Sequence, residues 1–166
     1  MSDAFVQLAE ILGSSPWREE RSLAAVEEEW AVRLPPEVHR VACSYGDALI
    51  DDFMFIYGPR TLKKKGVWMS EHVEGGGSRQ IVNPVLPRPG GMLLWGHTIE
   101  GDRLFLVPND SSGAWTVSAF RRNWGDWHET EIGVEEWLLG VFRGEIETDW
   151  LPEWPKRHAF ELSDSD

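Results

Sequence analysis

Hydrophobic residues in the first 46 positions recur at the spacing of amphipathic helices. They predict three helices, over residues 3–13, 22–30 and 36–46. Gly13 is a natural stop for the first helix, because glycine readily adopts the left-handed conformation that often ends a helix. The Pro35-Pro36 pair opens the third helix, where the missing backbone N–H costs nothing. The sequence therefore predicts a compact N-terminal layer of three short helices.

Beyond residue 46 the hydrophobic positions alternate or form short runs. This pattern predicts strands over residues 53–57, 67–69, 92–96, 103–107 and 115–120. The basic residues Lys63, Lys64 and Lys65 are expected in a loop before the second of these strands. Residues 74–91, rich in glycine and proline, are expected to form a long loop. Because tight turns join the last three strands, these strands predict an antiparallel meander.

Residues 134–144 again have hydrophobic residues at helical spacing, which predicts a further amphipathic helix. The predicted fold class is therefore α+β, with a mainly antiparallel sheet of about five or six strands flanked by N-terminal helices and a C-terminal helix. We expect one domain over residues 1–144 and an acidic C-terminal extension over residues 145–166. Trp150 and Trp154 are expected to dock the extension, and residues 163–166 have the composition of a disordered end.

Length and composition narrow the class of protein. The 166 residues suit a single domain, and 42% hydrophobic with 27% charged residues is ordinary for a globular chain. No apolar run reaches the roughly 18 residues that a membrane helix needs, and the first residues lack the pattern of a signal peptide. The only cysteine, Cys43, excludes an internal disulfide. These features predict a cytoplasmic protein that does not insert into a membrane.

The charge is unusual in its amount and its placement. The net charge is −12 at pH 7, and residues 124–166 contribute −9 of it. Such a field repels nucleic-acid phosphates and anionic membranes and attracts cationic partners, although solubility alone also explains it. The chain also holds 10 tryptophans, a residue that supplies large contact area in cores and at interfaces.

Four groups of residues follow one another along the chain: Leu34-Pro35 with Tyr45-Gly46, then Gly90-Gly91 with Trp95-Gly96 and Gly101-Asp102, then Trp115, and then Trp137. Their order resembles that of the SMI1/KNR4 (SUKH) superfamily. They span roughly residues 17–143, with the departures Ala31, where members often have glycine, and Leu106, where an aromatic residue is common. The resemblance implies an α+β domain whose signature residues are structural. The residues that carry it are Leu34, Pro35, Tyr45, Gly46, Gly90, Gly91, Trp95, Gly96, Gly101, Asp102, Trp115 and Trp137.

The resemblance also implies a function. Bacterial members of the superfamily are regarded as immunity proteins that bind toxins of polymorphic systems, many of them nucleases or deaminases. Fungal members act as regulatory scaffolds with several protein partners. The superfamily is not known for catalysis, so neither an enzymatic activity nor a cofactor is expected.

The candidate catalytic and ligand-binding groups have simpler structural interpretations. His39 and Cys43 lie four residues apart on a predicted helix, but no third group is placed to orient them as a nucleophilic pair. His97 and Asp102 border a predicted turn, where Asp102 is better explained as a cap. The glycines at 75–77 lack the strand and helix of a phosphate-binding loop. No closely spaced ligand pair predicts a metal site. A hydrolase is therefore the least favoured alternative.

The clearest candidate for a partner-binding surface precedes the last helix. Tryptophans and acids alternate there, which is typical either of a core edge with a solvated rim or of an interface for an Arg/Lys-rich partner. Asp51 and Asp52, just before a buried strand, are assigned to the same kind of surface. The predicted partner is a cognate toxin with a basic face, and the residues of the main segment are Trp124, Asp126, Trp127, Glu129 and Glu131.

Overall fold

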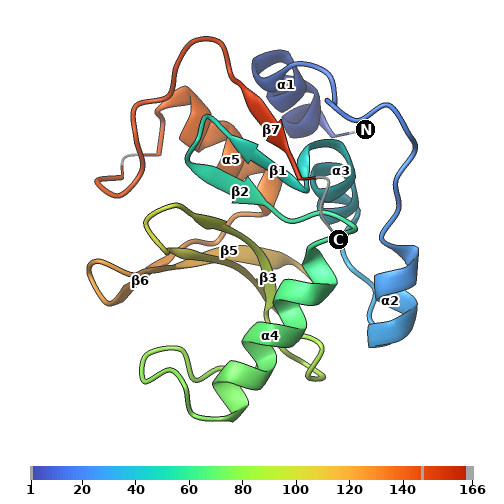
Figure 1. The fold of residues 1–166 in the computed structure, drawn as a ribbon, viewed down its shortest axis with the longest axis vertical. Helices are drawn as coiled ribbons and strands as arrows, with labels where there is room; N and C mark the ends of the chain where they lie inside the picture. Colours follow the sequence, from blue (N-terminus) through green and yellow to red (C-terminus); the bar gives the residue numbers. More distant parts are fainter. Residues whose placement is uncertain (1, 147, 164–166) are drawn as a thin grey trace.

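The computed structural model describes residues 2–146 and 148–163 and shows an α+β fold (Figure 1). Its helices are α1 (Asp3–Leu12), α2 (Ala24–Trp30), α3 (Pro36–Tyr45), α4 (Leu62–Glu74) and α5 (Val134–Arg143). Its strands are β1 (Ala48–Ile50), β2 (Met54–Ile56), β3 (Leu93–Thr98), β4 (Arg103–Pro108), β5 (Trp115–Arg121), β6 (Asp126–Glu129) and β7 (Phe160–Leu162). The predicted fold class is confirmed.

The strands form one antiparallel sheet in the order β6-β5-β4-β3-β2-β1-β7. The meander predicted for β3, β4 and β5 is confirmed, with Leu94 opposite Phe105 and Leu106 opposite Val117. The seven strands exceed the expected number, because the hydrophobic pattern misses β1, β6 and β7. Each of these has only three or four residues, too few for a clear alternation.

Helix α4 corrects the sequence analysis. Residues 62–74 are helical, so Lys63, Lys64 and Lys65 do not lie in a loop and residues 67–69 are not a strand. Leu62 and Met69 are buried seven residues apart, on one face of the helix. The prediction is wrong because a short apolar run without a clear period fits a buried helix turn as well as a strand.

The three predicted N-terminal helices are confirmed, with small shifts of their ends. Ser2 Oγ accepts a hydrogen bond from the backbone N–H of Phe5 at 3.2 Å and so caps α1. Helix α2 begins at Ala24 and ends at Trp30, where Ala31 adopts φ 51°. This left-handed conformation is costly for residues other than glycine.

Alternate residues of the central strands face different layers. Leu106 of β4 lies with Val38 of α3 and Val134 of α5, whereas Arg103 of β4 faces the opposite way and lies over the ring of Trp68 in α4. Helices α3 and α5, with α1 packed on them, therefore cover one face of the sheet, and α4 borders the other.

The C-terminal extension packs into the domain. Trp150 is 5% exposed and lies against Trp137 of α5, with ring centroids 6.2 Å apart. Trp154 contacts Phe53 and Phe142. The docking predicted for both tryptophans is confirmed, and the segment ends in β7, which pairs with β1. Ser163 donates its backbone N–H to the Asp47 carbonyl at 2.8 Å, and the rest of the predicted disordered end, residues 164–166, lies outside the described residues.

Candidate functional site

The predicted partner-binding residues 124–131 lie at one edge of the sheet, along the β5–β6 turn, strand β6 and the segment after it. Trp124 is 46% exposed, and the Arg121 guanidinium lies 4.9 Å from its ring centroid. Both carboxylate oxygens of Asp126 accept hydrogen bonds from Arg121 at 2.6 Å. These hydrogen bonds lower the pKa of Asp126 and keep it ionised. The turn therefore presents an exposed tryptophan beside a neutralised carboxylate.

The rest of this segment combines a half-buried tryptophan that packs on the core with exposed acids. Trp127 is half-buried and packs on Phe105 and Phe120, with ring centroids 5.8 and 5.4 Å away. Glu129 and Glu131 are exposed, and neither makes an ion pair with the described residues. We call the set Trp124, Asp126, Trp127, Glu129 and Glu131 the β6 surface. Trp127 is its link to the core, and Trp124, Glu129 and Glu131 are the groups that a partner can reach.

Asp51 and Asp52 lie elsewhere and differ from each other. Both have positive φ, in the turn between β1 and β2. The Asp51 side chain is 3% exposed and is hydrogen-bonded to His158 Nδ1 at 2.6 Å and to the Ala159 N–H at 2.8 Å. It holds the C-terminal segment and is not part of an exposed surface. Asp52 is exposed, without an ion pair among the described residues.

The strand order separates these aspartates from the β6 surface. Antiparallel pairing places the β1–β2, β3–β4 and β5–β6 turns at the same end of the sheet. However, β1 and β6 are five strands apart in the sheet order, or roughly 24 Å at about 4.8 Å per strand. Asp52 and the β6 surface therefore share one end of the sheet but do not form one contiguous patch.

The signature residues occupy close-packed positions. The ring of Trp95 meets that of Trp137 edge to face. A Cβ on Gly46 would lie 2.6 Å from the Gly58 Cα, and one on Gly96 would lie 2.6 Å from the Phe55 carbonyl oxygen. Such contacts explain on packing grounds why glycine stands at these two positions.

Other signature residues shape turns and helix ends. Asp102 accepts from the Thr98 hydroxyl at 2.5 Å and from the Arg122 N–H at 2.9 Å, which fixes the β3–β4 turn to the end of β5. Asp102 lies at the predicted turn, but the backbone N–H that its carboxylate accepts belongs to Arg122 and not to the turn itself. The remaining signature residues are buried Leu34, Tyr45 and Gly91, Pro35 at the start of α3, Gly90 and Gly101 with positive φ, and half-buried Trp115.

The candidate nucleophilic pair on α3, His39 and Cys43, does not have the arrangement of an activated nucleophile. His39 Nε2 lies 3.1 Å from the Glu27 carboxylate. Burial raises the pKa of the Cys43 thiol, which is the opposite of what an activated cysteine needs. Within residues 2–146 and 148–163, no hydrogen bond joins His39 to Cys43.

His97 is bonded to Tyr57 and not to Asp102. The Tyr57 hydroxyl and His97 Nδ1 are 2.6 Å apart, and the imidazole stacks on Phe55 with ring centroids 5.4 Å apart. Burial, followed by the nearby charges of Lys65 and Arg103, lowers the pKa of His97 to about 4. The imidazole is therefore neutral at pH 7. In the described part of the chain, no group of three or more His, Cys, Asp or Glu side chains is arranged to hold a metal ion.

Two ion pairs between an arginine and a buried carboxylate have no signal in the sequence. Arg21 pairs with Asp47, whose side chain is fully buried. Asp47 also accepts from the N–H groups of Gly58, Arg60 and Thr61. The second pair joins Arg40 of α3 to Glu135 of α5 at 2.7 Å. Their partners are 26 and 95 residues apart, so only the fold shows that they meet.

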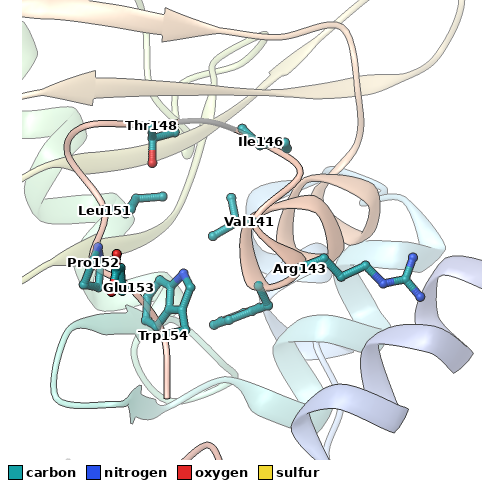
Figure 2. Close-up of a pocket in the computed structure, with 10 residues that line it drawn as sticks. Val141, Arg143, Ile146, Thr148, Leu151, Pro152, Glu153 and Trp154 are labelled. Atoms are coloured by element: carbon teal, nitrogen blue, oxygen red, sulfur yellow. The ribbon is translucent and has the colours of Figure 1, made fainter. Parts of the chain in front are cut away.

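A pocket of about 430 Å³ with both polar and apolar lining lies between the end of α5 and the C-terminal segment (Figure 2). Val141 and Leu151 point into it, Ile146 packs against α5 at its rim, and Trp154 lies at one side. The Arg143 guanidinium points away and donates to Gln7 of α1 at 2.6 Å. Among the described residues that line the pocket, no two groups are suited to acid–base chemistry.

The comparisons with known proteins leave the chain without an assigned family. No protein-family model, no curated protein and no solved structure matches it. Among the described residues, no helix combines the length and the apolar character that crossing a membrane requires.

Proposed function

We propose that this chain is a non-catalytic immunity protein of the SMI1/KNR4 (SUKH) type. It binds and neutralises a toxin domain of a bacterial polymorphic toxin system, and the toxin is a nuclease or another protein that acts in the cytoplasm. The binding face is the β6 surface, and the contacting face of the toxin is basic.

The observation that carries this proposal is the composition of the exposed sheet edge. Strand β6 is terminal in the sheet order, and no described strand pairs with its outer side, so its outer backbone groups are available for pairing with a partner strand. Trp124 supplies exposed aromatic area beside it, and Glu129 and Glu131 supply free carboxylates. Acids on an edge strand repel a second copy of the same strand and attract a basic one.

The charge of the whole chain supports the same partner. With a net charge of −12, the protein attracts a cationic partner over a distance and speeds its association at low salt. A nuclease needs a basic groove for phosphate, which provides the matching face. The local contacts of His39, Cys43 and His97 support a binding role over a catalytic one, since each is held in a packed arrangement.

The test begins with the genes beside this one: where a large polymorphic-type protein is encoded there, its C-terminal domain is co-expressed with this chain. We expect the wild-type chain to rescue cell growth and to co-purify with that domain, and added salt to weaken the complex. The variant Trp124→Ala with Glu129→Lys and Glu131→Lys is expected to lose rescue and to bind at least about tenfold more weakly.

The matched control is Trp68→Ala with Glu28→Lys and Glu71→Lys. Trp68 is 48% exposed, close to Trp124, and both glutamates are exposed on helices, so the control makes the same changes away from β6. Equal loss in both variants would remove the β6 surface from the proposal. Failure of the wild-type chain to rescue or bind, with several salt-insensitive partners instead, would favour the regulatory scaffold.

A further inference from the structure

A second pocket, of about 460 Å³, lies on the side of the sheet that α4 borders. Its size is in the range of pockets that take small molecules. Four parts of the chain form it: helix α4, the segment 77–81, the β3–β4 turn with the start of β4, and the end of β5 with Arg122 beyond it. We call it the α4 pocket.

The lining of the α4 pocket is cationic, although the chain as a whole is acidic. Arg79, Arg103 and Arg122 line it together with His72, and none of its lining residues is Asp or Glu. Six other arginines of the described chain form ion pairs with carboxylates. Within the same described residues, none of the three pocket arginines does. Three arginines therefore line one cavity whose other lining residues include no acid.

Close packing holds these groups in place. The Trp68 ring stacks on His72 with centroids 5.0 Å apart, and the Arg103 guanidinium lies 5.3 Å from the Trp68 ring centroid. A Cβ on Gly77 would lie 2.4 Å from the His72 ring, and one on Gly101 would lie 2.5 Å from the Arg122 Cδ. The two glycines thus allow the backbone to approach the His72 ring and the Arg122 side chain closely.

The pocket also has an apolar base. Met69, Ile81 and Phe120 line it and are 2%, 4% and 8% exposed. The Ser78 hydroxyl oxygen accepts the Ile81 N–H at 2.9 Å, which leaves its own hydrogen to donate. The pocket therefore offers cationic donors, a hydroxyl and an apolar wall to the same ligand.

From this arrangement we propose that the α4 pocket binds a small organic phosphate of about nucleotide size, with its phosphate group on Arg79, Arg103 and Arg122. The guanidinium group presents paired N–H donors that match phosphate oxygens, and the apolar base receives the organic part. A long polyanion such as nucleic acid would meet the repulsion of the whole acidic chain, whereas a small phosphate meets mainly the local charges. This site is independent of the β6 surface and of the proposed toxin binding.

The test is isothermal titration of the full chain with adenosine monophosphate at low salt, with adenosine and inorganic phosphate titrated in parallel. We expect the monophosphate to bind more tightly than either part alone. Arg79→Ala with Arg122→Ala is expected to weaken binding by about tenfold or more. Both arginines are exposed, so the fold is expected to persist, and a thermal melt checks this.

The matched control is Arg18→Ala with Arg33→Ala, two exposed arginines outside the pocket, which is expected to bind like the wild type. Equal weakening in the control would show a general charge effect and overturn the proposal. Absence of monophosphate binding at millimolar concentration would also overturn it. If a single-stranded oligonucleotide binds through Arg79 and Arg122 and the monophosphate does not, the surface serves nucleic acid instead.

Discussion

Ala31 has a left-handed backbone conformation, which glycine adopts more easily than alanine. It ends α2 with φ 51°, and a left-handed conformation costs an L-residue about 1–2 kcal/mol. Ala31→Gly is expected to raise the free energy of unfolding by up to about 1 kcal/mol, as measured by urea denaturation. Ala25→Gly, on the exposed face of the same helix, is the control and is expected to lower it by about 0.5–1 kcal/mol. A destabilised Ala31→Gly would show that the strain is absent.

His97 makes stability depend on pH. Its pKa falls from an ordinary 6.5 to about 4 in the folded chain, so the unfolded chain binds more protons between these values. The contribution to stability is complete above about pH 6.5 and is lost as the pH falls toward 4. His97→Gln is expected to lose less stability than the wild type between about pH 7 and pH 5, measured by urea denaturation at both. If His97→Gln and the wild type lost equal stability, a group other than His97 would cause the pH dependence.

Single residues show where sequence reasoning succeeds and where it stops. The place of Asp102 in the β3–β4 turn is predictable, because its partner Thr98 is only four residues away, but its bond to the Arg122 N–H, 20 residues away, is not. The inward orientation of the Asp51 side chain could not be predicted, because its partner His158 lies 107 residues further along the chain. Trp124 and Glu129 are found as a group because a short turn and an edge strand keep neighbours in sequence close in space.

At the scale of elements, the turn between β1 and β2 holds the C-terminal segment. Asp51→Ala removes the acceptor of the His158 and Ala159 hydrogen bonds. We expect a loss of about 2 kcal/mol and faster trypsin cleavage after Lys156 and Arg157, which are exposed, because the segment opens more often.

Asp52→Ala is the control for this experiment. Asp52 is the next residue, also has positive φ and is exposed. Its variant is expected to be cleaved at the wild-type rate. Wild-type rates for both variants would show that Trp150 and Trp154 hold the segment without the Asp51 contacts.

Element length and hydrophobic period explain which parts of the fold were predictable. Helices α1, α3 and α5 each have 10 residues and a clear apolar face. Helix α4 has Gly66 in the middle of its buried face, where a larger apolar side chain would have completed the helical pattern. The tip of the Trp30 ring fills that space, 2.6 Å from where a Cβ on Gly66 would lie. The buried face of α4 is therefore completed by Trp30 of α2, and the sequence of α4 alone lacks the full apolar pattern of a helix.

At the scale of the whole molecule, Asp47, which lies between α3 and β1, joins two other segments. It pairs with Arg21 of the connector between α1 and α2 and accepts backbone N–H groups of the β2–α4 segment. Arg21→Met would leave the Asp47 carboxylate buried without its cation, although the backbone donors at 58, 60 and 61 remain. We expect a loss of about 3–5 kcal/mol in urea denaturation. Arg18→Met, at an exposed site in the same connector, is expected to change little. A small loss in Arg21→Met would show that the backbone donors alone hold the carboxylate.

The pairing of β1 with β7 has a consequence for synthesis of the chain. Ala48 pairs with Leu162, so β1 emerges from the ribosome long before its outer neighbour exists. Until residues 160–162 are released, β1 presents an open edge, and the nascent chain can pair wrongly there. The late, long-range closure of the sheet also makes this step slow compared with helix formation. Chaperones that cover nascent strands are thus expected to matter most for this protein before β7 is available to pair with β1.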